Sequence, residues 1–137
     1  MMENPSLART GYVGQTGIEL TGVSADRVTG RLEISDIHDQ PYGLVHGGVH
    51  CTIIETLASE GAALWAIEQG MAGAVGVSNQ TDFIRATSGG VLLGEATPVH
   101  RGRTQQLWRV VVTREDDGKV AAQGQVRLQN VSDTEAF

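Results

Sequence analysis

The stretch GLVHGGVHCTIIETLASEGAALWAIEQG, residues 43–70, decides the fold of this chain. Its first eight residues contain three glycines and two histidines, so the backbone there carries little side-chain bulk. From Val49 to Gln69 apolar residues recur at helical spacing without a proline, and Gly70 is a typical stop signal. The pattern predicts one long helix that begins directly after a glycine-rich loop.

One face of this predicted helix carries Glu55 as its single charge. Within about 60° of Glu55 on a helical wheel the residues are small: Gly48, Cys51, Thr52, Ala58, Ser59, Ala62 and Ala66. A solvated helix face usually carries several charges, so this stripe indicates close approach of a ligand or another backbone. Partial desolvation there would raise the pKa of Glu55 and suit it to catalysis, the alternative being an ordinary surface glutamate.

The opposite face of the helix is expected to cover a sheet, because its side chains are large and apolar: Ile53, Leu57, Leu64 and Ile67. Glu60 is the competing carboxylate on this helix. It is interpreted either as a buried structural partner of a cation or as part of an exposed helix edge.

The flanking sequence predicts an antiparallel sheet. Residues 27–35 alternate polar and apolar side chains and can form a hairpin with residues 16–23. After the helix come four strand-like runs with short connections, at 74–84, 91–100, 104–114 and 119–130. Parallel crossovers need longer connections, so neighbouring strands are expected to be antiparallel. The 137 residues are predicted to form a single α+β domain, 1–137, with residues 1–15 as a loose arm holding at most one short helix.

Composition excludes several classes of protein. A formal net charge of −6 with dispersed basic residues argues against a nucleic-acid surface. The most apolar window, 49–67, contains His50, Glu55 and Glu60, which argues against a membrane span. The N-terminus lacks the basic start and apolar core of a signal peptide. The single cysteine, Cys51, is interpreted as a packed thiol and fits a reducing compartment, so a cytoplasmic protein is expected.

The glycines at the helix start suggest a binding function for the backbone. The first amide N–H groups of a helix have no intrahelical acceptor, and the helix dipole is positive at this end. At Gly47 and Gly48 no side chain shields these groups, so they can bind a substrate oxygen as an oxyanion hole. The alternative is that the glycines serve only the turn.

The motif QPYGLVHGGV, residues 40–49, followed by Glu55 and Ser59, resembles the hotdog-fold acyl-CoA thioesterases of the 4-hydroxybenzoyl-CoA and phenylacetate-degradation type. The resemblance covers most of the chain and includes PVHRGRTQQLW, residues 98–108. It implies an antiparallel sheet wrapped around one long central helix. It also implies hydrolysis of an acyl-CoA thioester to a free carboxylic acid and CoA, with no metal or redox cofactor.

The resemblance assigns roles residue by residue. Glu55 matches the nucleophile or general base, and Gly47 matches the residue whose backbone N–H polarises the thioester carbonyl, with His46 supporting the loop. Gln40 matches a glutamine that orients the thioester or the attacking water. Ser59 matches a hydroxyl residue that positions water, and a glutamate on the helix points to the 4-hydroxybenzoyl branch.

Further substrate contacts are expected from Gly48 and Thr52 at the helix start. Arg101 and Arg103 form a small candidate anion site, for which the alternative is a solvated loop.

The spacing of Gly47 and Glu55 predicts an oligomer. Eight residues of helix rise about 12 Å, so one chain cannot bring both groups to the same carbonyl. Two subunits with antiparallel helices can do so, and the stripe of small residues permits their approach. A homodimer, or a tetramer built from two such dimers, is therefore expected.

Several alternatives stay open. His46 and His50 have the spacing of a zinc-protease histidine pair, but Gly47 stands where the catalytic glutamate would be, so no metal is expected. An acyl-CoA hydratase or dehydratase and a non-catalytic acyl-CoA binder use the same fold. The acyl group is not determined, because aromatic residues are few and Trp65 and Phe83 are expected mainly in the core, with the lining of a pocket as the alternative.

Overall fold

The computed structural model describes residues 11–133. The elements follow the order α1 (Gly11–Thr16), β1 (Glu19–Val23), β2 (Val28–Glu33), the short 3-10 helix η1 (Asp36–His38), α2 (Gly47–Glu68), β3 (Gly73–Phe83), β4 (Val91–Arg101), β5 (Gln105–Arg114) and β6 (Val120–Val131). The long helix is confirmed and begins two residues earlier than predicted, at the glycines. The four strands after it match the predicted ranges to within one residue at each end, and the predicted N-terminal hairpin is β1–β2.

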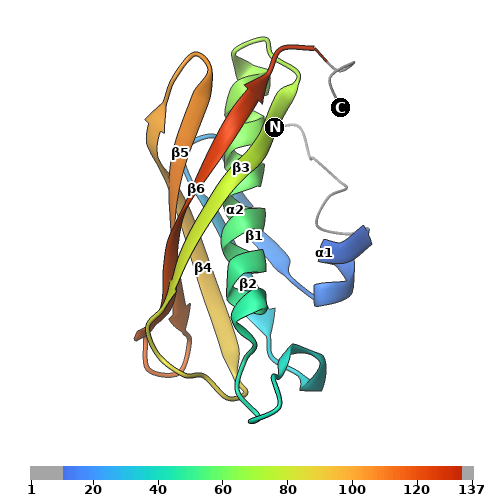
Figure 1. Ribbon diagram of the computed structural model, residues 1–137, viewed down its shortest axis with the longest axis vertical. Coiled ribbons are helices and arrows are strands. Elements are labelled where there is room, and N and C mark those ends of the chain that lie inside the picture. The colour runs from blue at the N-terminus through green and yellow to red at the C-terminus, as the bar shows by residue number, and fades with distance from the viewer. Residues whose placement is uncertain (1–10, 134–137) are drawn as a thin grey trace.

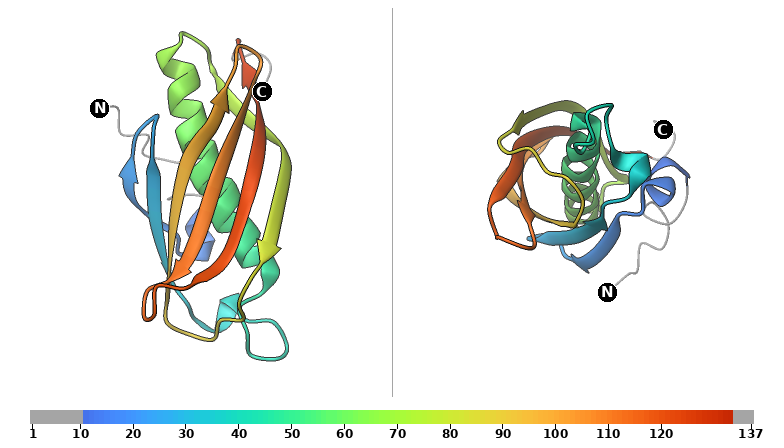
Figure 2. Two further views of the ribbon diagram at one scale, coloured as in Figure 1. Left: turned by 90° about the vertical axis from the view of Figure 1, so that its left-hand side faces the viewer. Right: turned by 90° about the horizontal axis from the view of Figure 1, so that it is seen from below.

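The six strands form one antiparallel sheet in the order β1-β2-β4-β5-β6-β3. The sheet curls around α2, as the view along the helix shows most clearly (Figures 1 and 2). This arrangement is the hotdog fold. Among the described strands β3 lies at an edge and pairs only with β6, from Gly73↔Val131 to Phe83↔Ala122, with an irregularity between Gly76 and Ser78.

The curled sheet covers more of α2 than the helical wheel predicts, because all six strands contact the helix. Ile53 and Leu57 are buried as expected, but Ile67, expected on the same face, is exposed. The three alanines assigned to the open stripe, Ala58, Ala62 and Ala66, are 0% exposed. That assignment was wrong, since a strongly bent sheet reaches around the helix onto the small-residue side. The open part of the stripe is its N-terminal part, where the exposed or partly exposed residues are Gly48, Cys51, Thr52, Glu55 and Ser59.

Glycine permits the closest contacts between helix and sheet. A Cβ atom at Gly61 would lie 2.5 Å from the fully buried indole of Trp108 on β5. A Cβ atom at Gly94 on β4 would lie equally close, 2.5 Å, to Leu57. Both positions therefore require a residue without a side chain, and they fix the distance of α2 from the middle of the sheet.

A buried polar network joins α2 to β5 and β6. The Gln106 side-chain amide donates to the carbonyl of Ala62 at 3.0 Å and to Oδ1 of Asn130 at 2.7 Å. The Gln106 oxygen accepts from the Trp108 indole N–H at 2.8 Å. Satisfied in this way, these buried groups stabilise one packing arrangement of the helix on the sheet. No helix within residues 11–133 has the length and apolar character needed to cross a membrane.

Candidate active site

The first turn of α2 presents an amide group without a protein acceptor. His46 is the N-cap residue, and its Nδ1 accepts a hydrogen bond from the Gly48 N–H at 2.8 Å. The neighbouring Gly47 N–H has no hydrogen-bond acceptor within residues 11–133. Because unpaired amides at a helix start favour negative charge, this group is suited to bind a carbonyl oxygen. The Gly48 amide, expected to be available to a substrate oxygen, is thus occupied by His46, and the Gly47 amide is the one that is left without an acceptor in this range.

An aromatic ring lies next to this amide. A Cβ atom at Gly47 would meet Cζ of Phe83 at 2.8 Å, so a side chain there would displace the ring. Phe83 ends β3 and is 59% exposed, so its expected place in the core was wrong. Its ring also faces His50, with the two ring centroids 6.0 Å apart.

Glu55 lies two turns further along α2, on the part of the stripe that stays open. Its carboxylate is partly buried and accepts a hydrogen bond from Ser59 Oγ at 3.5 Å. On its other side it lies against β3, where a Cβ atom at Gly76 would be 2.8 Å from Oε2. Burial raises the pKa of Glu55 above its ordinary value, and the weaker effect of the Ser59 hydrogen bond lowers it. Such a carboxylate is suited to accept a proton or to attack a carbonyl.

A groove of about 300 Å³ adjoins Glu55 on the open side of α2. Its lining residues come from three elements: Tyr12 and Val13 of α1, Cys51, Thr52, Glu55 and Thr56 of α2, and Asn79 of β3. Asn79 is held in place because its side-chain amide donates to the Cys51 carbonyl at 3.2 Å and its Oδ1 accepts from Thr81 Oγ1 at 2.7 Å.

Gln40 lies in the loop before α2, and its side chain turns back into that loop. Its Oε1 accepts from the Tyr42 N–H, and its backbone carbonyl accepts from the Gly43 N–H at 2.9 Å. The loop is joined to the helix start because the His46 N–H donates to the His38 carbonyl at 2.8 Å. Within one chain the structure does not bring the Gln40 side chain into contact with Glu55.

The two candidate anion-binding arginines lie near the other end of α2. The Arg101 guanidinium donates to the Ala25 carbonyl at 2.8 Å and to Asp26 at 2.9 Å, and it stacks over Trp65 at 5.6 Å. Arg101 therefore joins the β1–β2 hairpin to the last turn of α2. Arg103 is exposed in the turn between β4 and β5.

Two further titratable side chains are buried. Glu60 is 4% exposed and has no hydrogen-bonding or ionic partner among residues 11–133, so burial raises its pKa. His50 is 3% exposed, its Nδ1 has no hydrogen-bond partner in that same range, and burial lowers its pKa. The part of the chain described by the structure contains no cluster of three or more His, Cys, Asp or Glu side chains suited to a metal ion.

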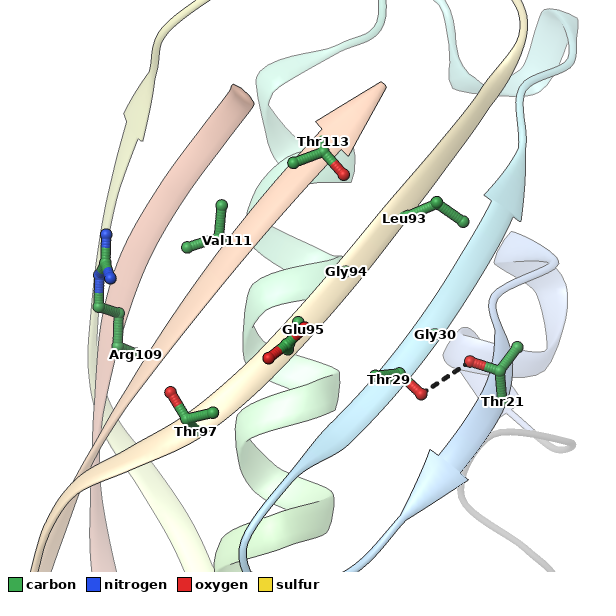
Figure 3. A pocket seen from close by; sticks show the side chains of 10 residues that line it. All are labelled: Thr21, Thr29, Gly30, Leu93, Gly94, Glu95, Thr97, Arg109, Val111 and Thr113. Atoms are coloured by element: carbon green, nitrogen blue, oxygen red, sulfur yellow. Dashed lines mark hydrogen bonds between the residues drawn. The ribbon is translucent and has the colours of Figure 1, made fainter. Parts of the chain in front are cut away.

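A larger hollow, about 390 Å³, lies on the opposite face of the sheet from α2 (Figure 3). Threonines dominate its lining, and its two charged side chains are Glu95 and Arg109. Glu95 is engaged in an ion pair with Arg27 at 3.0 Å. This hollow lacks the unpaired amide and the isolated carboxylate found near α2, so it is a poor candidate for the reaction site.

No local pattern in the sequence places Tyr12, Gly76, Asn79 or Phe83 beside the candidate site. Tyr12 belongs to the segment 1–15, interpreted as a loose arm with one short helix; α1 is such a helix and contacts α2 through Tyr12, and residues 1–10 of the arm lie outside the described residues. The other three positions lie on β3, whose alternation predicts a strand but not its position beside Glu55 and Gly47. Their place depends on which strand lies at the edge of the sheet, and that is a property of the whole fold.

Known proteins share both the sequence and the fold. The family model for the Thioesterase superfamily matches residues 42–121. The protein named "Putative esterase Rv1847" of Mycobacterium tuberculosis is 45% identical over 121 residues, covering 88% of this chain and 86% of that protein. Its solved structure superimposes with a TM-score of 0.84 at 43% identity, covering 88% of this chain and 95% of that chain.

Two further relatives have more specific names. The proofreading thioesterase EntH of Klebsiella pneumoniae is 33% identical over 100 residues, 73% of this chain and 72% of that protein. The 1,4-dihydroxy-2-naphthoyl-CoA hydrolase of Listeria monocytogenes is 30% identical over 101 residues, 74% of this chain and 80% of that protein. The family match spans the glycine-rich loop, the whole of α2 and the strands β3 to β5, and on this evidence the chain belongs to the thioesterase superfamily.

Proposed function

We propose that the protein is an acyl-CoA thioesterase that releases a free carboxylic acid and CoA. The observation that carries the proposal is the combination on α2 of an unpaired Gly47 amide and a partly buried Glu55 carboxylate whose pKa is raised. Two relatives support this reaction class by their names, a proofreading thioesterase and a hydrolase of an aromatic acyl-CoA.

The proposed mechanism uses these two groups on the same thioester. The carbonyl oxygen accepts a hydrogen bond from the Gly47 N–H, which stabilises the negative charge that develops during attack. Glu55 either removes a proton from water, whose oxygen bonds to the carbonyl carbon, or attacks that carbon itself and forms an anhydride that water then hydrolyses. In both cases the C–S bond breaks, the sulfur leaves with its electron pair, and CoA takes up a proton.

The remaining predicted residues support this chemistry. His46 holds the helix start through the Gly48 N–H, and Ser59 holds the Glu55 carboxylate. We assign Gln40 the task of orienting the thioester or the water, which requires its amide to leave the Tyr42 N–H. We assign contacts with the substrate near the helix start to Gly48 and Thr52, and contacts with the CoA phosphates to Arg101 and Arg103.

The site requires two subunits, because Gly47 and Glu55 lie about 12 Å apart along the axis of one helix. The edge strand β3 offers the pairing surface. Its backbone groups on one side have no partner among the described strands, and Val75 and Val77 on it are exposed. Glu55 lies against Gly76 of this strand and Gly47 lies against Phe83. Antiparallel pairing of two β3 strands would therefore bring Glu55 near Gly47 of the partner subunit.

The reaction class is tested by thiol release from a panel of aromatic, short-chain and long-chain acyl-CoAs. We expect hydrolysis of at least one class, and a loss of on the order of a hundredfold or more in kcat for Glu55→Gln. Glu68→Gln is the matched control, since Glu68 is exposed on the same helix. An unchanged rate in Glu55→Gln would remove Glu55 from the mechanism. Hydration of crotonyl-CoA without thiol release would assign a lyase instead.

The shared site is tested by mixing two inactive variants. Gly47→Pro removes the N–H at a helix position that tolerates proline, and it is made together with Phe83→Ala to avoid the ring. Phe83→Ala alone is the reference. The chain with Gly47→Pro and Phe83→Ala is unfolded and refolded together with the Glu55→Gln chain. Half of the dimers then contain one chain of each kind, and each of these dimers has one intact site out of two. About a quarter of the reference activity should therefore return. No recovery despite mixed dimers would place both groups in one chain or discard one of them.

A further inference from the structure

Within the described part of the chain, one hydrogen bond joins α1 to α2, and its direction can be deduced. The Tyr12 and Thr52 hydroxyl oxygens are 2.9 Å apart, and Thr52 donates its proton to the Gly48 carbonyl at 2.8 Å. Because a hydroxyl has a single hydrogen, Tyr12 must be the donor to Thr52. This bond fixes the phenol ring beside the first turns of α2, although the ring itself is 68% exposed.

The fixed ring forms one wall of the groove beside Glu55. Tyr12 and Val13 line it from α1 and Asn79 from β3, and Cys51 and Thr56 line it from α2. Among residues 11–133, Glu55 is the only charged side chain that lines this groove. Its volume of about 300 Å³ is at the lower end of the range for ligand pockets, so it suits part of a substrate and not a nucleotide.

We propose that this groove holds the acyl group of the thioester and that Tyr12 is the residue that limits its length. The inference rests on the proposed function, which places the thioester carbonyl carbon next to Glu55. Atoms bonded to that carbon must then lie within a few ångströms of the carboxylate, and the groove is the hollow that Glu55 itself lines. The phenol ring and Val13 supply apolar surface to a short acyl chain, and the Tyr12 wall stops a longer one.

The first test compares acyl-CoAs from acetyl to dodecanoyl by kcat/KM. Tyr12→Ala removes the wall and should move the optimum to longer chains, with at least a tenfold gain for the long chains relative to the short ones. Tyr12→Phe keeps the ring but removes the hydrogen bond to Thr52 that fixes it, so its optimum should lie between those of the wild type and Tyr12→Ala. Gln15→Ala, exposed on the same helix, is the control for damage to α1. An unchanged profile in Tyr12→Ala would overturn the proposal.

The second test does not need turnover. Cys51 is the only cysteine of the chain and lines the groove, so its alkylation by iodoacetamide reports whether the groove is occupied. In the Glu55→Gln variant we expect hexanoyl-CoA or benzoyl-CoA to slow the labelling at least fivefold and CoA alone to leave it unchanged. Equal protection by CoA alone would assign the groove to the pantetheine arm, which overturns the proposal.

The remaining outcomes separate the two proposals. A Cys51 that reacts only after unfolding would mean that a partner subunit covers the groove, and labelling unaffected by bound acyl-CoA would place the acyl group elsewhere. Both results overturn the groove assignment while hydrolysis by the wild type, lost in Glu55→Gln, still supports the thioesterase. Acyl-CoA protection of Cys51 without hydrolysis of any substrate by the wild type would instead keep the groove and discard the hydrolytic function.

Discussion

The Glu55 carboxylate lies directly against the backbone of Gly76, so closely that a Cβ atom at Gly76 would be 2.8 Å from Oε2 and 3.1 Å from Oε1. Gly76 belongs to β3, at the irregularity of its pairing with β6. The absence of a side chain there leaves room for the carboxylate beside the sheet. The position of the proposed catalytic group thus depends on a glycine in a different element.

Gly76→Ala should therefore lower kcat/KM by about tenfold to a hundredfold, since small displacements of a reacting group have effects of this size. The change is measured by thiol release together with thermal unfolding. Stability should change little, because Gly76 is exposed. Ser78→Ala, two residues further on the same strand, is the control and should keep full activity. Equal losses in both variants would indicate a general disturbance of β3.

Ser59→Ala should move the acid limb of the pH–rate profile to higher pH. The Ser59 hydroxyl donates to the ionised Glu55 and lowers its pKa, in opposition to burial. Without that bond, burial alone acts on Glu55 and its pKa is higher. Because Glu55 must be ionised to act, activity is then lost at a higher pH as the solution is made more acidic. Ser59→Thr keeps a hydroxyl and should retain the wild-type limb. The measurement is kcat/KM against pH, and an unmoved limb in Ser59→Ala would contradict the assignment.

His46 is expected to act as a helix cap and not as a proton carrier. His46→Ala removes the acceptor of the Gly48 N–H and should cost about 1 kcal/mol of unfolding free energy, with reduced activity. His46→Asn provides an oxygen acceptor at the N-cap and should recover most of both losses. Urea unfolding and thiol release give the two readouts. Full stability with no activity in His46→Asn would show that the imidazole has a chemical role.

Glu60→Gln should stabilise the protein at neutral pH. Burial raises the pKa of Glu60, so the folded state binds its proton more tightly than the unfolded state does. The free energy of unfolding therefore falls as the pH rises from the pKa of Glu60 in the unfolded state to its higher pKa in the folded state. Above that pH the buried, ionised carboxylate destabilises the fold. The variant should gain about 1 kcal/mol at pH 7 and nothing at pH 4. A loss at pH 7 would reveal a cationic partner in the assembled protein.

The periodicity of the sequence was sufficient for the elements themselves. The run from Val49 to Gln69 and the alternation of the later strands predicted α2 and β3 to β6 with nearly correct ends. The short turns fixed antiparallel pairing. The glycines at the start of α2 predicted two free amides, of which Gly47 keeps one and Gly48 has its own bound to His46, and the lone carboxylate predicted the raised pKa of Glu55.

Features that depend on the bending of the sheet were not predicted. A helical wheel shows that Ala58, Ala62 and Glu55 share a face, but not that the sheet reaches around far enough to bury the alanines and leave Glu55 open. Similarly, the sequence near Phe83 and Tyr12 says nothing of their distance from α2. Both side chains approach the helix through contacts between residues far apart in the chain.

The edge position of β3 bears both on the proposed catalysis and on aggregation. This strand has 11 residues, contains no proline, and carries one charged side chain, Asp82. Long strand edges of this kind template the addition of foreign strands and so promote aggregation. Self-association through β3 would occupy that edge. The same step would complete the proposed active site and cover the unpaired backbone groups that promote aggregation. A chain unable to self-associate would then be inactive and would also tend to aggregate with other proteins.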